Sequence, residues 1–277
     1  MDWLYTLRAR WHLGTSGHRA QLEALPEPLY AFWARSVARE YPSLPRNRYT
    51  FLRAAEGLVY FFKAVSATGR ACALPSAAAD SVWHAWLAWN RINLGTYGST
   101  HFGRDVSHLP NASLASTALA HTLVLCRELE GKPAHGPDLP SLFRLDRDVR
   151  MPGGHGYFRT AEGIMYVPLS PRGRTARRPA LHPKLTPDAL LAAGLITRRQ
   201  YAALLREQRM MSDDTAATWA GADTTALAFA DAEDSSSSDR GDSLAYDASS
   251  SDSSGSDSGS SDCGSSCGGS SCGGGGD

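Results

Sequence analysis

Residues 75–110, PSAAADSVWHAWLAWNRINLGTYGSTHFGRDVSHLP, predict the central helix of the protein. Ser76 follows Pro75 and can serve as the N-cap, and Asp80 lies early enough to favour the positive helix end. Large apolar side chains then cover most of the helix circumference: Val82, Trp83, Trp86, Leu87 and Trp89. A helix that is apolar on most sides is typically buried, so we expect this one to lie in the core.

Helical spacing continues on both sides of this segment. Apolar residues recur at three- and four-residue intervals in residues 22–69, which indicates two helices separated by the proline-bounded residues 42–45. Residues 114–129 predict a further amphipathic helix, whereas three glycines predict that residues 93–110 are irregular or only partly helical. Because residues 20–130 show no sustained alternation of period two, the expected fold class is mainly α, a compact helical bundle of four or five helices with a disordered C-terminal tail.

Composition divides the chain into segments of different character. Residues rich in Pro and Arg favour an extended linker, and a Ser/Gly/Asp/Cys-rich segment buries too little apolar surface to offset the entropy of ordering. The predicted organisation is an N-terminal lead segment (1–20), a helical domain (21–158), a basic Pro/Arg-rich linker (159–185), a short helical hairpin (186–211) and a disordered acidic tail (212–277).

The formal net charge of zero is the sum of two unlike parts. Residues 234–277 contain eight aspartates and one arginine, a net of −7, which leaves +7 on residues 1–233. An acidic tail either keeps a protein soluble, which is the commoner case, or folds back on the basic body. The sequence shows no secretory signal and no apolar run near the roughly 20 residues that span a bilayer, so we expect a cytoplasmic location.

Asp80 and His84 form the clearest candidate site. They are four residues apart and therefore project from the same helix face, close enough to share a hydrogen bond or a cation. With His108 from the following loop they would form a three-ligand set suited to zinc or non-haem iron, and His101 and His121 are spare candidates. The alternative is structural, with Asp80 capping its helix and His84 satisfying a buried carbonyl group.

Two other patterns allow a functional and a structural interpretation. Trp83, Trp86 and Trp89 could stack bases or sugars, but their angular spread around the helix favours core packing. The basic stretch 170–184, SPRGRTARRPALHPK, could contact phosphate, but it contains no interleaved aromatic residue and favours a solvated linker. The sequence therefore gives no strong nucleic-acid signal.

The five cysteines do not indicate a disulfide framework, because their number is odd and no secretory signal is present. Cys72 and Cys126 are expected to be packed thiols. Cys263, Cys267 and Cys272 lie in a glycine-rich tail, where they could capture a soft metal or react in redox chemistry, although structural zinc usually takes four ligands.

Several of these residues together resemble a known family. The chain has Pro75-Ser76, Asp80, Trp83-His84, Phe102-Gly103, His108 before Pro110, the run Leu142-Phe143-Arg144-Leu145-Asp146 and a Cys/Gly-rich end. This order over residues 45–155 resembles uncharacterised bacterial relatives of the glycine-rich domain-containing proteins. The resemblance implies a helical fold with an Asp/Trp/His core and no particular activity, and Ser107 stands where the family pattern has a second histidine.

Two functions remain open on the sequence. The first is a non-enzymatic binding or scaffolding module, whose helical body recognises a protein partner and whose acidic tail is a flexible arm. The second is a metal-binding protein, either without activity or as a metal-dependent hydrolase or oxygenase, that uses Asp80, His84 and His108. No nucleophile elbow, phosphate-binding glycine loop or paired CxxC motif favours another enzyme class.

Overall fold

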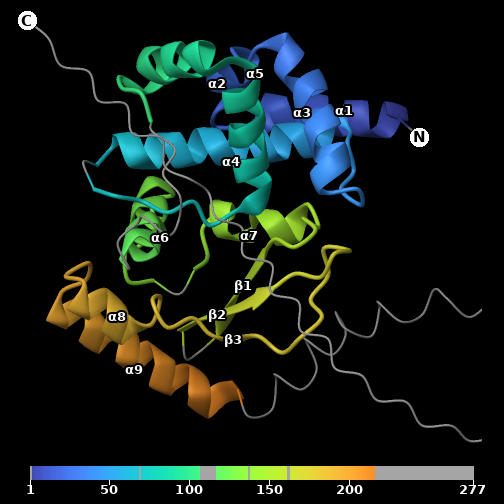
Figure 1. The fold of residues 1–277 in the computed structure, drawn as a ribbon. Coiled ribbons are helices and arrows are strands. Elements are labelled where there is room, and N and C mark those ends of the chain that lie inside the picture. Colours follow the sequence, from blue (N-terminus) through green and yellow to red (C-terminus); the bar gives the residue numbers. More distant parts are fainter. Residues whose placement is uncertain (1, 69, 107–116, 137, 161–162, 216–277) are drawn as a thin grey trace, which may run out of the picture. The chain divides into compact units, whose positions relative to one another are not determined.

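Two long helices, α4 (Arg48–Ser66) and α5 (Ala77–Phe102), cross at the centre of the fold (Figure 1). The structure, a computed structural model, describes residues 2–68, 70–106, 117–136, 138–160 and 163–215. These residues all belong to one of the two units into which the chain divides, Met1–Thr224. The remaining helices are α1 (Asp2–Thr15), α2 (Arg19–Glu23), α3 (Glu27–Glu40), α6 (Ala118–Leu129), α7 (Ser141–Asp148), α8 (Pro187–Ala192) and α9 (Arg198–Thr215).

Helix α5 begins where the sequence predicts. The Ser76 side chain accepts a hydrogen bond from the Ala79 amide at 3.2 Å, which confirms it as the N-cap. Trp83 and Trp86 are buried against α4 and its neighbours, and Trp89 is partly buried beside the same core. The core-packing interpretation is therefore confirmed for Trp83 and Trp86, whose buried rings offer no surface for stacking a base, and Trp89 packs against the edge of the same core.

The sequence predicts that residues 93–110 are irregular or only partly helical, and among the described residues the second alternative holds, because the helix continues to Phe102 and ends at Gly103. Asn90 leaves the helical conformation (φ −162°, ψ 93°), and its side-chain oxygen accepts from the Asn93 amide at 2.9 Å. Asn90 thus caps a new helical stretch that runs to Phe102. Gly98 lies inside it because a Cβ there would sit 3.0 Å from the Arg104 carbonyl oxygen, so this glycine permits a close approach of the chain and does not break the helix.

The fold also contains an antiparallel sheet that the sequence analysis did not predict. Its strands are β1 (His155–Thr160), β2 (Gly163–Pro168) and β3 (Ala180–Leu181), in the order β1-β2-β3. Tyr157 pairs with Tyr166 in the register of β1 and β2. The expectation of a bundle of four or five helices is corrected accordingly: the described part of the chain is mainly helical, with nine helices and this small sheet.

The sheet overlaps the end of the predicted helical domain (21–158) and part of residues 159–185, where the sequence favours an extended basic linker. Two of its strands are six residues long and one has two residues, so each offers few inward side chains to reveal a period of two. The Pro- and Arg-rich residues lie mainly in the connection from β2 to β3, where Arg172, Arg174, Arg177 and Arg178 are exposed. The basic composition therefore belongs to the connection between β2 and β3. The strands on either side of it have no composition that would distinguish them as strands.

A second hydrophobic core lies between the sheet and the helices around it. Phe143 of α7, Tyr157 of β1 and Leu190 of α8 are buried in it, together with residues of α6 and α9. Helices α8 and α9 occupy the segment where the sequence predicts a short helical hairpin. None of the helices within the described ranges is long and apolar enough to cross a membrane.

Both cysteines in the described residues are free and buried, as expected for packed thiols. Burial raises the pKa of the Cys126 thiol well above its ordinary value, and it also raises that of Cys72. Because the thiolate is the reactive form, both sulfurs are kept unreactive. The three tail cysteines lie outside the described residues.

Candidate functional site

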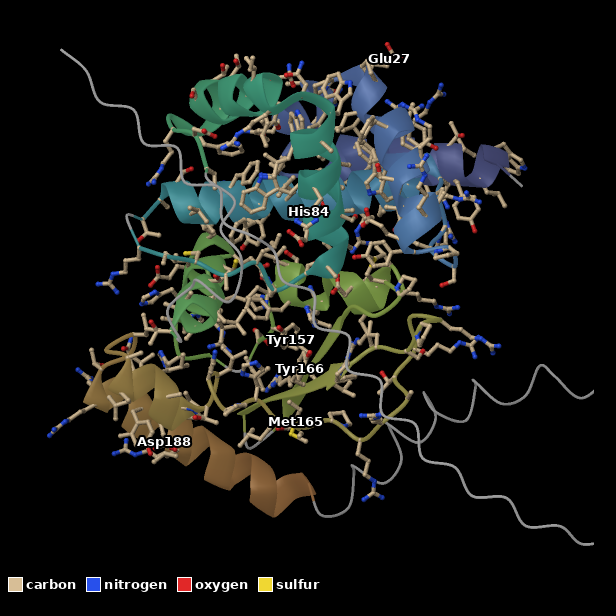
Figure 2. The ribbon with its side chains drawn as sticks, in the orientation of Figure 1. Glu27, His84, Tyr157, Met165, Tyr166 and Asp188 are labelled. Atoms are coloured by element: carbon tan, nitrogen blue, oxygen red, sulfur yellow. The ribbon has the colours of Figure 1, made fainter. Side chains whose placement is uncertain are left out.

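The structure brings Asp80 and His84 together on the solvent side of α5. The His84 Nε2 atom lies 3.7 Å from the Asp80 Oδ2 atom, and the two side chains are 53% and 38% exposed. Figure 2 labels His84 on this helix. The separation is longer than an ordinary hydrogen bond, but it is the spacing that two ligands of one cation could adopt after small rotamer changes.

The third predicted ligand, His108, falls outside the described residues. The spare candidates do not join the pair: the His101 ring packs against Tyr97 with a centroid distance of 4.5 Å, and His121 Nδ1 lies 3.2 Å from the carbonyl oxygen of Ala71. Within the described ranges no three His, Cys, Asp or Glu side chains are grouped as metal ligands. No third ligand therefore joins Asp80 and His84 in the described part of the chain.

A second carboxylate in the recognised sequence pattern, Asp146, is buried and has a structural role. It is 1% exposed, and its two oxygens accept hydrogen bonds from Ser76 Oγ at 2.6 Å, the Ala77 and Ala78 amides at 2.9 Å each, and the His155 amide at 2.8 Å. These donors belong to the start of α5 and to β1. Asp146 therefore fastens α7 to both elements and leaves little acceptor capacity for a substrate.

The sheet carries a cluster of tyrosines and histidines. The Tyr157 and Tyr166 rings are 5.3 Å apart (Figure 2), and His155 Nδ1 lies 3.1 Å from the Tyr166 hydroxyl oxygen. His182 packs on Tyr166 edge to face, with a centroid distance of 5.5 Å. Burial raises the pKa of both tyrosines, and burial, Lys184 and His155 lower that of His182. These shifts favour the neutral forms of Tyr157, Tyr166 and His182.

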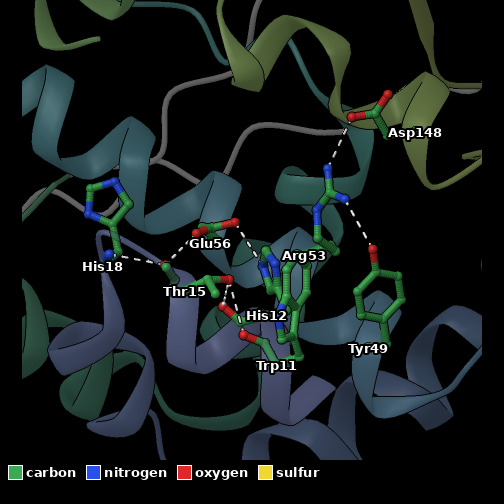
Figure 3. A network of polar contacts seen from close by, with 9 residues as sticks. Trp11, His12, Thr15, His18, Tyr49, Arg53, Glu56 and Asp148 are labelled. Atoms are coloured by element: carbon green, nitrogen blue, oxygen red, sulfur yellow. Dashed lines mark hydrogen bonds and ion pairs between the residues drawn. The ribbon is translucent and has the colours of Figure 1, made fainter. Parts of the chain in front are cut away.

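Helix α1 is joined to α4 by a polar network that sequence reasoning missed (Figure 3). His12 Nε2 lies 2.9 Å from Glu56 Oε2, and the Ser16 hydroxyl donates to Glu56 Oε1. Ser16 also accepts from the His18 amide at 3.0 Å. His12 lies in the last turn of α1 and Ser16 directly follows the helix, so the end of α1 and the residue after it both contact one carboxylate.

The pKa values of Glu56 and His18 are both lowered in this network. Burial acts to raise the pKa of Glu56, but the hydrogen bonds from His12 and Ser16 and the charges of His12 and His18 outweigh it, so the pKa is lowered. Burial and the positive charge of Lys63 lower the pKa of His18, against the opposing effect of Glu56. A carboxylate beside a neutral His18 is therefore the favoured state of the network.

The same α4 helix is fastened to α7 through Arg53. Its guanidinium donates to the Tyr49 hydroxyl oxygen at 3.2 Å and to the Asp148 carboxylate at 3.0 Å (Figure 3). Burial lowers the pKa of Arg53, but Tyr49 and Asp148 together raise it above its ordinary value. Glu56 thus holds α1 on α4, and Arg53 holds α7 on α4. Both residues act through charge-assisted contacts.

A family model described as UCP032817-like matches residues 27–166, which are 140 of the 277 residues. The chain belongs to the UCP032817-like family. No curated protein and no solved structure matches it. The UCP032817-like segment runs from Glu27, the first residue of α3, to Tyr166 in β2, both labelled in Figure 2, and includes Ser76 and Asp146.

Helix α1 lies before the UCP032817-like segment and has an unusual outer face. Its inner face is fixed by buried Ala9 and by the contacts of His12 with Glu56. The outer face carries four exposed large apolar side chains: Trp3 at 64%, Leu4 at 47%, Leu7 at 50% and Trp11 at 73%. We call these four residues the α1 outer stripe.

The sequence did contain the signal for the α1 outer stripe. Positions 3, 4, 7 and 11 follow the three- and four-residue spacing of an amphipathic helix. That spacing alone would place the four side chains in the core. Their exposure becomes evident only when α4 is seen to hold the opposite face of α1, so the stripe is the strongest candidate for an interaction surface in the described residues.

Proposed function

We propose that the protein is a non-enzymatic binding module and that α1 is its binding element. The observation that carries the proposal is the α1 outer stripe, in which two tryptophans and two leucines are about half to three-quarters exposed on one short helix. Single exposed apolar residues are normal on protein surfaces, but a contiguous group of this kind marks an interaction site. Tryptophan is also among the residues that contribute most to binding free energy.

The attachment of α1 supports the same function. Glu56 holds the helix through His12 and Ser16, so the stripe is presented on a fixed support. A rigid binding element loses less conformational entropy when it meets its partner than a flexible one does. The acidic segment 234–277 would act as a solvating arm on such a module, in a cytoplasmic protein with a scaffolding role.

The relationship to glycine-rich domain-containing proteins is part of the proposal. What supports it is that Ser76 and Asp146, which belong to two separate parts of the recognised pattern, are joined by a hydrogen bond. Two parts of the sequence pattern that contact each other in the fold are better evidence of a family relationship than the same residues would be if they lay far apart on the surface. The relationship implies a structural core and assigns no reaction to it.

Photo-crosslinking in cells that express the protein tests the binding module. Benzoylphenylalanine is placed at Leu7, in the middle of the stripe, or at the exposed Ala202 of α9 as a control. We expect adducts of a defined partner, protein or lipid, at position 7 in clear excess over position 202. Equal yields at the two positions would show that the stripe is not covered by a partner and would overturn the proposal.

The metal-binding alternative is favoured by one observation, the 3.7 Å approach of His84 Nε2 to Asp80 Oδ2 on an exposed strip. In this function Asp80, His84 and His108 hold zinc or iron, and any metal-dependent reaction takes place there. Elemental analysis of untagged full-length protein tests it. Stoichiometric metal that is lost in His84→Ala, with unchanged folding by circular dichroism, supports the alternative, and metal-free wild-type protein removes it.

A further inference from the structure

The outer face of α1 has a charge pattern as well as an apolar stripe. At about 100° of rotation per residue, the four stripe residues cover about 100° of the helix circumference. Arg10 follows Trp3 at one edge, and Arg8 follows Leu4 at the other. Both arginines are exposed, and neither has an acidic partner among the described side chains. The surface is therefore apolar in the middle and cationic on both sides.

This pattern argues against a second copy of the chain as the partner. Two α1 helices that met through their stripes would bring arginine edges together, and like charges opposite one another are unfavourable. The stripe also offers four side chains, whereas stable protein interfaces use roughly 20–30 residues on each side. A small apolar stripe between cationic edges therefore fits an anionic partner that can bind through a small contact area.

A lipid bilayer surface with anionic headgroups meets these requirements. Helices that lie in a bilayer interface carry Trp and Leu on the lipid side and Lys or Arg beside them. Tryptophan is enriched at the level of the headgroups, and arginine extends its charged end from apolar surroundings toward phosphate. The 14 residues of α1 are too few to span a bilayer but sufficient to lie along one.

We infer that α1 docks the protein on anionic lipid membranes, with Trp3, Leu7 and Trp11 inserted at the headgroup level and Arg8 and Arg10 on lipid phosphates. The inference rests on the proposed binding function and names the partner of that site. The α4 contacts of α1 remain in place, because His12 and Ser16, which contact Glu56, do not belong to the α1 outer stripe. The protein would therefore lie on the membrane as a folded body.

Vesicle co-sedimentation of the full-length protein tests this inference. The vesicles contain phosphatidylcholine alone or phosphatidylcholine with phosphatidylserine in a ratio of about 7:3, which imitates an anionic leaflet. We expect the wild-type protein to bind the anionic vesicles at least about tenfold more tightly than the neutral ones, and high salt to weaken this binding.

Two double variants separate the apolar from the charged contribution. Trp3→Ser with Trp11→Ser should lower binding to anionic vesicles at least about tenfold, because the inserted side chains are lost. Arg8→Glu with Arg10→Glu should remove the preference for phosphatidylserine. The matched controls are Ile92→Ser, which removes an apolar side chain that is 84% exposed on α5, and Arg198→Glu with Arg199→Glu, which reverses two exposed charges on α9.

The possible outcomes distinguish the lipid inference from the binding function. Binding that is absent, equal on the two vesicle types, or unchanged in the Trp3/Trp11 variant overturns the lipid inference. If such a result accompanies crosslinking of position 7 to a protein, the binding module stands with a protein as its partner. If position 7 gives no adduct either, both fail. All variants change exposed side chains, and circular dichroism checks that they fold.

Discussion

The Ser76 hydroxyl donates a hydrogen bond to Asp146 Oδ1 at 2.6 Å, although the two residues are 70 positions apart. The same Ser76 oxygen accepts from the Ala79 amide, so one side chain both caps α5 and binds the carboxylate of α7. A carboxylate is favoured there because the amide groups at a helix N-terminus carry partial positive charge. This contact links the start of the central helix to α7 and, through the His155 amide, to the sheet.

Replacing Asp146 by Ala should destabilise the protein strongly. Four hydrogen bonds to a buried carboxylate are lost, and their donors are left without acceptors, so we expect about 3–5 kcal/mol of lost unfolding free energy. Urea unfolding followed by circular dichroism measures this change. The control is Asp188→Ala on α8, where an exposed carboxylate accepts from Tyr201, and its effect should stay below about 1 kcal/mol. Equal effects of the two variants would contradict a structural role for Asp146.

Close packing of α4 on α7 gives a second test, at Gly57. A Cβ at this position would lie 2.3 Å from Leu145 Cδ2, so Gly57→Ala should cost about 1–3 kcal/mol even though alanine favours helix formation. The control is Gly95→Ala in α5, where the nearest side-chain atom would be 3.8 Å away. Thermal unfolding should show a lower Tm for the first variant and an unchanged or slightly higher Tm for the second. A Gly57→Ala protein as stable as wild type would contradict the packing described here.

Local signals made part of this fold predictable. A cap residue indicates the start of α5, and tryptophans at helical spacing indicate that the helix lies in the core. Both signals lie within a few residues of the structure that they specify. The approach of His84 to Asp80 also follows from their spacing alone. These features need no knowledge of how the helices pack.

The remaining features depend on contacts between distant segments. The sheet was not predicted because its strands are short and their inner residues are Tyr157, Ile164 and Val167 among glycines and prolines. The role of Asp146 depends on α5 and β1, which its own sequence neighbours do not indicate. The direction of the α1 outer stripe depends on Glu56, because periodicity shows that a helix is amphipathic but does not show which face is covered.

Folding stability should decrease as the pH falls below about 6.5, the ordinary pKa of histidine. Burial and Lys63 lower the pKa of His18 in the folded state, and burial and Lys184 lower that of His182. The unfolded chain therefore binds protons at a higher pH than the folded protein does. The stabilisation is fully present above the unfolded pKa and is lost as the pH falls through the folded pKa.

The substitution His18→Gln isolates one part of this pH dependence. We expect the loss of unfolding free energy between about pH 7.5 and 5.5 to be smaller in this variant than in wild type, because one group that protonates preferentially in the unfolded state is gone. The control is His84→Gln, a half-exposed residue of α5. Urea midpoints at the two pH values provide the measurement, and identical pH profiles for wild type and His18→Gln would refute the assignment.

Glu56 should control how firmly α1 is held on the body. In Glu56→Ala the His12 and Ser16 side chains lose their shared acceptor, so we expect about 1–3 kcal/mol less free energy for local opening of α1. Since 1.4 kcal/mol corresponds to about tenfold in an equilibrium constant, amide hydrogen exchange in α1 should become about fivefold to a hundredfold faster. Exchange in α8 and in the strands β1 and β2 should change much less. Glu128→Ala on α6, which removes an exposed carboxylate, is the control and should leave α1 unchanged. Uniformly faster exchange across all elements would show instead that Glu56 stabilises the whole fold and does not specifically hold α1.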